Sequence, residues 1–211
     1  MDTLKGVNRG CMDRSSGQAD HPADVAVVVP VKSFAVAKER LAEAVPADQR
    51  ARLAERMATG VVGAAAPLPT FVVCGDPTVA AWATRVGAGV INLARPGLNR
   101  AVQFAADVLG ADGYRRVIVA HADLPLAHTL AWVGQSDGVT IVPDRRQDGT
   151  NVLSVPLRVG FRFRYGPGSA AAHREEADRL GLTVRTVPDE QLGWDVDVPA
   201  DLAELPADQQ P

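Results

Sequence analysis

Cysteine, long apolar runs and net positive charge are all scarce in this chain. Only two of its 211 residues are cysteines, and the wide separation of Cys11 and Cys74 resembles neither a disulfide framework nor the spacing of metal ligands. No apolar run approaches the roughly 20 residues of a membrane-spanning helix, and residues 1–20 contain no apolar stretch of the signal-peptide type. We therefore expect neither an exported nor a membrane-embedded protein, but one of the reducing cytoplasm.

The charge balance argues against another class of partner. The formal net charge is -3 and the sequence pI is about 5.8, so neither a nucleic-acid backbone nor an anionic membrane is expected as the main partner. Positive charge that serves the function must therefore be concentrated locally. The chain also contains no Walker A motif and no obvious histidine or cysteine nucleophile motif.

The composition predicts one folded domain with polar ends. A chain of this length with 46% hydrophobic residues is large enough to bury a core. Residues 1–23 are polar and lack periodicity, so we expect a disordered leader there. Residues 24–205 would form the domain, and residues 206–211 a C-terminal tail.

Apolar runs and helical patterns alternate through most of this domain. The run 25–31 is apolar and rich in β-branched residues, as in a buried parallel strand. Further strands are expected at 70–74, 89–93, 116–120 and 139–142, and helices at 35–44, 48–65, 78–86, 99–109 and 127–133. This alternation predicts an α/β fold in which helices cover both faces of a mostly parallel sheet, with ligands bound beyond the carboxyl ends of the strands.

The pattern is less regular after residue 150. We expect a segment at 151–156, a further segment at 162–165, a helix at 169–180 and a strand near 183–187. This half would have mixed topology and would select the acceptor.

Three stretches, 29–41, 120–125 and 165–197, combine residue types that handle phosphate and metal ions. They are a basic loop after a strand, an Asp-Leu-Pro turn after another strand, and a glycine-rich loop followed by a pair of aspartates. Transfer of a nucleotidyl group to a phosphate brings two strong anions together, so catalysis depends on neutralising charge and on in-line positioning. The phosphate acceptor is already largely ionised at neutral pH and needs no dedicated general base. The order of the stretches along one chain therefore indicates nucleotidyl transfer to a small phosphorylated acid.

Asp123, Asp195 and Asp197 are the candidate metal ligands. Asp123 ends a strand, so its side chain can project from the carboxyl edge of the sheet, where a divalent ion could bind carboxylate and phosphate oxygens together. The alternative is a cap for the following helix or turn. Asp195 and Asp197 would point to opposite faces of a true strand and would converge only in a turn. Their spacing alone therefore leaves a solvated turn before a helix at 199–205 as the alternative.

Lys32, Lys38 and Arg40 are the candidate triphosphate contacts. Lys32 follows the first strand, and Lys38 would open the next helix, where helix-end amides also favour anions. Both lysines would brace the triphosphate and stabilise the departing pyrophosphate, with Arg40 as a helper. The alternative is a solvated loop with ordinary surface lysines.

A compact loop that contains Gly166, Gly168 and Ser169 enters the helix expected at 169–180. Such a loop leaves amides and a hydroxyl exposed to an anion, so Gly166 and Ser169 are candidate contacts of the acceptor's phosphate or carboxylate. A β-turn followed by an N-capped helix would explain the same residues. His173 lies one helical turn after Ser169, but a lone histidine is more often structural, so it stays outside the candidate set.

Together these motifs resemble those of the guanylyltransferases of coenzyme F-420 biosynthesis, the 2-phospho-L-lactate or phosphoenolpyruvate guanylyltransferase family. The resemblance runs from about residue 26 to residue 205. It rests on Pro30 to Leu41, Gly97-Leu98-Asn99, Asp123-Leu124-Pro125, Pro143 to Asn151, Tyr165 to Ser169 with His173, and Asp195 to Leu202.

The resemblance implies a Rossmann-like α/β/α sandwich, the nucleotidyltransferase fold of the glycosyltransferase-A type. It implies an enzyme that joins GTP to a small phosphorylated carboxylic acid and releases pyrophosphate, with Mg²⁺ as cofactor. Asp123, Asp195 and Asp197 would bind the metal ion, Thr150 the acceptor, and Asn99 the nucleotide, although Asn99 is also expected to cap its helix. The acceptor would be phosphoenolpyruvate or 2-phospho-L-lactate, with 3-phosphoglycerate as a further candidate. The oligomeric state stays open, with a homodimer as one option.

Two residues depart from the family's usual pattern. Ala122 precedes Asp123 where the family commonly has glycine, which adds a methyl group close to the approaching phosphate, and Ala170 follows Ser169 where a larger residue is frequent. Another nucleotidyltransferase or a nucleotide-sugar glycosyltransferase of the same fold is one alternative to the guanylyltransferase, although the Asp-x-Asp pair of a glycosyltransferase would lie in mid-chain. A non-catalytic nucleotide-binding module is a second alternative, against which the retained aspartates and lysines argue.

Overall fold

A mixed sheet forms the centre of the fold. The computed structural model describes residues 24–94 and 97–206, so the expected leader at 1–23 and residues 207–211 of the expected tail lie outside the described residues. The strands are β1 (Val25–Pro30), β2 (Thr70–Cys74), β3 (Gly89–Asn92), β4 (Arg116–Ala120), β5 (Val139–Pro143), β6 (Thr150–Pro156) and β7 (Val184–Thr186). Their order is β3-β2-β1-β4-β6-β5-β7. Only β6 runs antiparallel to its neighbours among these strands, so the predicted mostly parallel sheet is confirmed.

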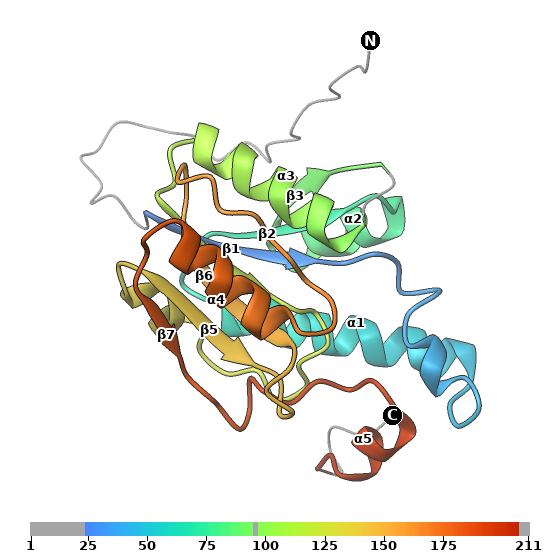
Figure 1. Cartoon of the computed structure of the whole chain (residues 1–211). Coiled ribbons are helices and arrows are strands. Elements are labelled where there is room, and N and C mark those ends of the chain that lie inside the picture. Colours follow the sequence, from blue (N-terminus) through green and yellow to red (C-terminus); the bar gives the residue numbers. More distant parts are fainter. Residues whose placement is uncertain (1–23, 95–96, 207–211) are drawn as a thin grey trace.

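Helices cover both faces of the sheet. They are α1 (Ala47–Ala64), α2 (Pro77–Arg85), α3 (Leu98–Ala111), α4 (Ser169–Arg179) and α5 (Pro199–Ala203), with the 3-10 helices η1 (Glu39–Leu41) and η2 (Ala131–Gln135). Figure 1 shows α3 above and α1 below β1. Val27 and Val29 of β1 pack with α1 and α2, whereas Ala26 and Val28 pack with α3. Because both faces are covered, the strand is an unbroken apolar run.

The helix pattern of α1 shows how the sequence specifies this packing. Leu53, Met57 and Val61 fall on one face, as predicted, with exposures of 1%, 3% and 0%. Burial of side chains of this size stabilises the fold by about 1.5–3 kcal/mol each. Leu53 and Met57 also contact a cluster that contains Val196 and Leu202, so α1 supports the C-terminal segment. None of the described helices combines the length and apolarity needed to cross a bilayer.

Two predicted helices are wrong. Instead of a helix at 35–44, the chain forms successive turns and the short helix η1, because Lys38 adopts a left-handed backbone conformation with φ 56° that a right-handed helix excludes. In place of the helix expected at 127–133, the chain forms η2, which begins at Ala131.

The segment 161–165 alternates buried and exposed residues but pairs with no described strand. Its backbone N–H groups donate instead to side chains of α3 and α4, in the pairs Arg162 to Glu176, Arg164 to His173 and Tyr165 to Asn99. Side chains therefore satisfy the donors that a neighbouring strand would otherwise have satisfied.

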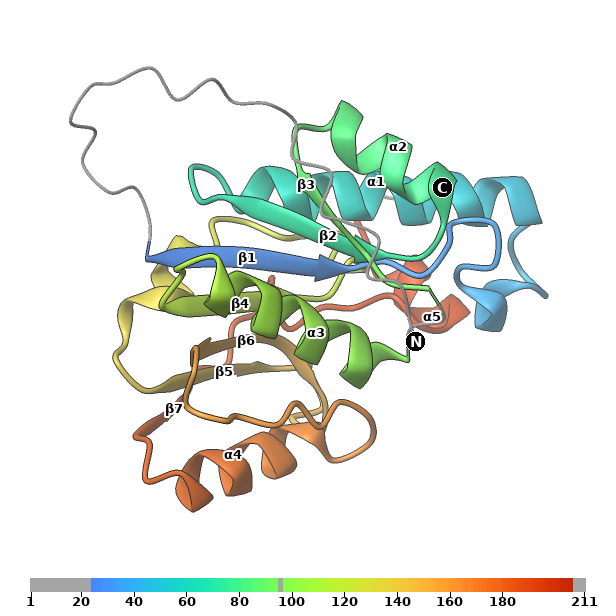
Figure 2. The same ribbon diagram turned by 90° about the horizontal axis from the view of Figure 1, so that it is seen from above.

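The carboxyl ends of the central strands meet the C-terminal segment. Figure 2 shows α5 beyond the carboxyl end of β1. The backbone N–H of Val196 donates to the carbonyl oxygen of Asp123, which follows β4, at 3.3 Å. The turn after β4 and the segment before α5 are thus direct neighbours, although they lie far apart in the sequence.

Candidate active site

A cavity of about 830 Å³ opens at this edge of the sheet. Its walls come from the segment after β1, the turn after β4, the β5–β6 hairpin, the start of α4 and the segment before α5. Asn99 is the one candidate residue that does not line this cavity. The candidates that line it are Lys32, Lys38, Arg40, Asp123, Thr150, Gly166, Ser169, Asp195 and Asp197. This is the location that the rule for the carboxyl ends of parallel strands predicts.

Lys38 joins carboxylates from two distant segments. Its Nζ lies 2.6 Å from Asp123 Oδ2 and 3.6 Å from Asp197 Oδ1. The side chain of Lys38 is 9% exposed and that of Asp123 is 26% exposed, so their ion pair is largely withdrawn from water. Burial alone would raise the pKa of Asp123, but the charges of Lys38 and His121 lower it below its ordinary value. Asp123 is therefore ionised at neutral pH.

Asp195 is the third carboxylate of this group. Burial raises its pKa, and the negative charges of Asp123 and Asp197 raise it further, while a hydrogen bond with Asn151 acts in the opposite direction. Asp195 is therefore close enough to Asp123 and Asp197 for their negative charges to act on it.

Asp195 and Asp197 face the same cavity from a segment without regular secondary structure. Residues 194–198 belong to neither a strand nor a helix, and both aspartates line the cavity wall. Val196, which lies between the two aspartates, is fully buried in the apolar cluster beside α1. One apolar anchor thus leaves both neighbouring carboxylates on the cavity side.

Asp201 fixes this segment from inside the protein. Its side chain is 1% exposed, and its Oδ2 accepts hydrogen bonds from the N–H groups of Asp197 and Val198 at 2.7 and 2.8 Å. Its Oδ1 forms an ion pair with Arg145, whose guanidinium lies 4.3 Å from the ring centroid of Trp194. Asp201 therefore links the backbone of Asp197 to the β5–β6 hairpin.

The three aspartates have the donor chemistry that suits a divalent cation. Carboxylate oxygens are ligands that Mg²⁺ prefers. Asp123 Oδ1 is buried and has no hydrogen-bond partner among the described residues, so the site contains an unsatisfied anionic oxygen. Within residues 24–94 and 97–206, no three His, Cys, Asp or Glu side chains are already arranged as a metal site. The ammonium group of Lys38 instead contacts the carboxylates of Asp123 and Asp197.

The other basic residues after β1 differ in their surroundings. Lys32 is exposed in the cavity wall. The side chain of Arg40 is 75% exposed, and its NH1 lies 3.3 Å from Asp197 Oδ2. Lys38 precedes only the three residues of η1, so the prediction that helix-end amides assist it is wrong. Binding of a triphosphate here would depend on side-chain charge.

The loop before α4 has the predicted turn geometry, but its amides are already engaged. Gly168 is the N-cap of α4 with a left-handed φ of 71°, a conformation that favours glycine. Its N–H donates to Asp148 Oδ2 at 3.0 Å, and the N–H of Ser169 donates to the carbonyl oxygen of Gly166 at 3.1 Å. The expectation that these two amides are free for an anion is therefore wrong. A carboxylate of the protein itself lies at this helix N-terminus.

Thr150 lies in the cavity wall against a buried histidine. Thr150 is 1% exposed, and its Oγ1 lies 3.0 Å from Nδ1 of His173. Nε2 of His173 accepts a hydrogen bond from the N–H of Arg164 at 3.0 Å. Burial lowers the pKa of His173 to about 4, and the nearby charges of His121 and Arg164 act in the same direction. The imidazole is therefore neutral at neutral pH.

Asn99 holds the glycine-rich loop from outside the cavity. It is the second residue of α3, whose N-cap is Gly97, so the predicted capping role is wrong. Its Nδ2 donates to the carbonyl oxygen of Tyr165 at 3.0 Å, and its Oδ1 accepts from the N–H of Tyr165 at 2.5 Å. Both bonds fix the residue that precedes Gly166. A contact between Asn99 and the nucleotide stays a prediction.

The sequence reasoning missed two supporting residues, Asp148 and Asp201. An acidic residue in the first turn of a helix is a visible signal for Asp201. Its pairing with Arg145, 56 positions away, is not visible without the fold. Asp148 lies in the Asp-Gly-Thr-Asn segment, but nothing in that segment indicates that it would bond to the start of α4.

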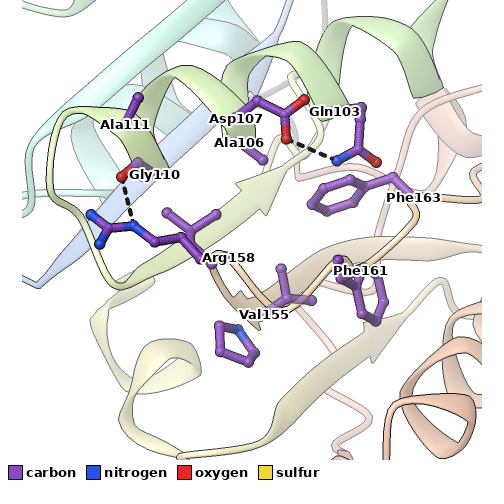
Figure 3. A pocket seen from close by; sticks show the side chains of 12 residues that line it. Gln103, Ala106, Asp107, Gly110, Ala111, Val155, Arg158, Phe161 and Phe163 are labelled. Atoms are coloured by element: carbon purple, nitrogen blue, oxygen red, sulfur yellow. Dashed lines mark hydrogen bonds between the residues drawn. The ribbon is translucent and has the colours of Figure 1, made fainter.

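A second cavity, of about 420 Å³, lies away from these residues, between α3 and the segment after β6 (Figure 3). Figure 3 shows Gln103 beside Asp107 and Arg158 reaching the carbonyl oxygen of Gly110, with hydrogen bonds of 3.3 and 2.8 Å. None of the candidate residues lines this cavity. The chemistry suggested by the motifs therefore belongs to the larger cavity.

Comparisons with known proteins find similarity along most of the chain. A family model described as guanylyl transferase CofC like matches residues 25–208. A phosphoenolpyruvate guanylyltransferase from Rubrobacter xylanophilus is 34% identical over 192 residues, which cover 87% of this chain and 94% of the relative. A 2-phospho-L-lactate guanylyltransferase from Halorubrum lacusprofundi is 38% identical over 191 residues, which cover 85% of this chain and 82% of the relative.

A solved structure supports the predicted fold. It is a protein from Desulfovibrio desulfuricans G20 that is provisionally called a nucleotide-diphospho-sugar transferase. It superimposes with a TM-score of 0.67 at 20% sequence identity, over 85% of each chain. The predicted fold class, the nucleotidyltransferase fold of the glycosyltransferase-A type, is thus confirmed.

Proposed function

The chain belongs to the family of CofC-like guanylyl transferases, and from this premise we propose that it transfers GMP from GTP to phosphoenolpyruvate and releases pyrophosphate. 2-Phospho-L-lactate is the alternative acceptor, because relatives named for each acid are similar to this chain over most of its length. The observation that carries the proposal is the pairing of Lys38 with Asp123 and Asp197, in one cavity with Asp195 and Thr150.

The proposed reaction joins two anions at phosphorus. An oxygen of the acceptor's phosphate attacks the α-phosphorus of GTP and forms a phosphoanhydride. The bond from that phosphorus to the oxygen that bridges to the β-phosphate breaks, and pyrophosphate leaves with this oxygen. The attacking oxygen is largely ionised at neutral pH, so no proton has to be removed first. The protein must therefore supply charge compensation and alignment.

Lys32 and Lys38 would provide the first part of this compensation. Lys32 is exposed in the cavity wall, where it can contact phosphate oxygens, and Arg40 lies near the same rim. Lys38 is held by Asp123 at 2.6 Å, so its charge is fixed at the centre of the site. A charge fixed in advance needs little reorganisation during the reaction.

Mg²⁺ would provide the second part. Four basic and six acidic side chains line the cavity, so the lining is net negative before any substrate enters. Two anionic substrates would add to this excess, and a divalent cation would offset it. Asp123, Asp195 and Asp197 would hold the ion, and the unpaired Oδ1 of Asp123 is available for it. When bound, the ion would polarise phosphate oxygens and stabilise the charge that develops at the α-phosphorus.

Thr150, Ser169 and the backbone around Gly166 would contact the acceptor acid. They lie on the wall formed by β6 and the start of α4, and they line the same cavity as the lysines and aspartates. Because the amides of Gly168 and Ser169 are engaged within the protein, these two N–H groups do not contribute, and the hydroxyl groups of Thr150 and Ser169 are the side-chain donors on this wall.

The direct test is to follow pyrophosphate release by the full chain with Mg²⁺, each nucleoside triphosphate and each of the three candidate acids. We expect release with GTP and phosphoenolpyruvate. Release only with another nucleotide would favour a different nucleotidyltransferase. No release from any combination, despite nucleotide binding, would favour a non-catalytic module and overturn the proposal.

Replacing Asp123 by alanine tests the central carboxylate. We expect no measurable turnover and an unchanged circular dichroism spectrum, because the substitution removes the partner of Lys38 without removing core contacts. Asp107→Ala is the matched control, since Asp107 lines only the smaller cavity, and it should keep normal turnover. Near-normal turnover of the Asp123→Ala variant would remove Asp123 from the mechanism.

A further inference from the structure

Both ring nitrogens of His173 are engaged, and their partners determine which nitrogen carries the proton. Nε2 lies 3.0 Å from the backbone nitrogen of Arg164, and Nδ1 lies 3.0 Å from Thr150 Oγ1. A backbone N–H can only donate, so Nε2 is the acceptor of that bond. A neutral imidazole has one N–H, which must then be at Nδ1. Nδ1–H therefore donates to the hydroxyl oxygen of Thr150.

This hydrogen bond fixes the direction of the Thr150 hydroxyl. An oxygen that accepts from Nδ1–H keeps its own proton for a different acceptor. The bond to His173 is the one hydrogen bond that Thr150 Oγ1 forms with the described residues. Thr150 also lines the larger cavity, beside Asn151 and Ser169. Its hydroxyl proton is therefore available to an anionic group bound in that cavity.

Aromatic packing holds the His173 ring in place. The ring of Tyr165 lies 4.8 Å from it at 74°, and the ring of Phe161 lies 6.1 Å from it. His173 itself is fully buried. The charged or titratable neighbours His121 and Arg164, together with burial, keep the imidazole neutral. The ring can therefore orient the Thr150 hydroxyl, but it brings no positive charge to the site.

We propose that His173 is a positioning residue that fixes the hydroxyl of Thr150 as a hydrogen-bond donor to the carboxylate or phosphate of the acceptor acid. The identity of the ligand rests on the proposed function, whereas the protonated nitrogen of His173 does not. A hydroxyl that could rotate freely would have to lose its other orientations when the anion binds. The effect should therefore appear in acceptor binding and not in GTP binding.

The first experiment measures the tautomer in the unmodified protein. Nitrogen NMR of the His173 ring at neutral pH should show a neutral imidazole with its proton on Nδ1. A proton on Nε2, or a charged imidazolium, would overturn the proposal. This measurement needs no substrate, so it gives the same answer whether or not the proposed reaction is correct.

The second experiment is a double-mutant cycle that follows the KM and the calorimetric Kd of phosphoenolpyruvate. Thr150→Val should raise both by about 10- to 100-fold, because it removes a hydrogen bond to a charged group, and should change the KM of GTP less than about twofold. His173→Leu should act similarly alone but add little in the Thr150→Val background. His173→Asn, whose amide N–H can still donate to Thr150, should restore most of the affinity. Additive effects in the cycle would refute the proposal.

Glu176→Leu, which removes the side-chain acceptor, is the matched control for loosening of the segment 161–165. Glu176 accepts a hydrogen bond from the N–H of Arg162 at 3.0 Å, much as His173 accepts from Arg164, but it does not touch Thr150. Its substitution should leave the acceptor's Kd unchanged, and an equal rise would mean that His173 acts only by holding this segment. If His173→Leu does not fold, the NMR measurement of the tautomer and the comparison of Thr150→Val with His173→Asn still test the proposal. If phosphoenolpyruvate binds but does not react, the proposed function fails while the cycle of Kd values still tests His173. If no acid binds, both fail.

Discussion

Replacing Asp201 by asparagine tests whether the C-terminal aspartates are positioned from inside the protein. Asp201 is 1% exposed, accepts two backbone hydrogen bonds from the segment 197–198 and pairs with Arg145. Asparagine has the same shape but no charge and one acceptor oxygen fewer. Hydrogen bonds to charged groups contribute about 1.5–3 kcal/mol each, and breaking a buried ion pair costs about 3–5 kcal/mol. Because the Arg145 side chain is 28% exposed and water recovers part of the loss, we expect a decrease of about 2–4 kcal/mol in the free energy of unfolding.

The same substitution should lower activity, although Asp201 is not expected to touch a substrate. Weaker anchoring of residues 197–198 would let Asp195 and Asp197 move, and a misplacement of about 1 Å can reduce a rate about 100-fold. We therefore expect kcat/KM for GTP to fall by about 10- to 100-fold, and the Mg²⁺ concentration for half-maximal activity to rise. Urea unfolding and steady-state kinetics measure the two effects.

Glu204→Gln is the control for the loss of a carboxylate beside Arg145. Its Oε2 lies 3.7 Å from Arg145 NH1, but the side chain is 60% exposed, so we expect a change in stability below about 0.5 kcal/mol. If Asp201→Asn changed stability no more than this control and left kcat/KM intact, the argument that Asp201 anchors the segment would be refuted.

Three further predictions concern other parts of the molecule. Arg116 is 8% exposed and donates to the carbonyl oxygens of Gly138 and Asp137 at 2.7 and 2.5 Å. Arg116→Met should therefore lower the free energy of unfolding, measured in urea, by about 2–4 kcal/mol without changing the KM of GTP or of the acceptor. An unchanged free energy of unfolding would contradict this prediction. His173 has a pKa of about 4 in the fold against 6.5 for an ordinary histidine, so the unfolded chain binds its proton first, and stability should fall by about 3 kcal/mol as the pH is lowered from about 6.5 to about 4. Urea titrations across this range should show a shallower fall for His173→Asn, and parallel curves would count against a neutral buried imidazole. Ser169→Ala should raise the acceptor's KM but not that of GTP, and an unchanged acceptor KM would remove Ser169 from the binding wall.

The sequence predicts the sheet well because its strands are strongly patterned. β1 and residues 117–120 of β4 are buried on both faces, so they form unbroken apolar runs between helical patterns. The helix expected at 35–44 fails for the opposite reason. Its residue types suit a helix. Lys38, however, pairs with Asp123 and has a left-handed backbone conformation, which local propensity does not indicate. A contact across 85 positions overrides the local preference.

The sequence allows a prediction of which residues form the candidate site, but not of the hydrogen bonds that they make. The rule for carboxyl ends of parallel strands brings Lys32 and Asp123 to one edge without any coordinates. The engagement of the Gly168 amide by Asp148 could not be predicted in this way, because glycine-rich loops with free amides and with occupied amides have the same residue types. Loop residues that bond to a distant hairpin leave no periodic signal.

The spacing of Asp195 and Asp197 shows the same limit at the proposed metal site. Strand periodicity places residues i and i+2 on one face, so the expectation that the pair diverges in a strand is wrong. In the structure, Val196 between them is buried and both carboxylates lie on the cavity side. What the spacing cannot supply is the distance of that backbone from Asp123. Asp201 sets this distance by holding the N–H of Asp197, so the ability of the pair to share a cation with Asp123 depends on a residue outside the pair.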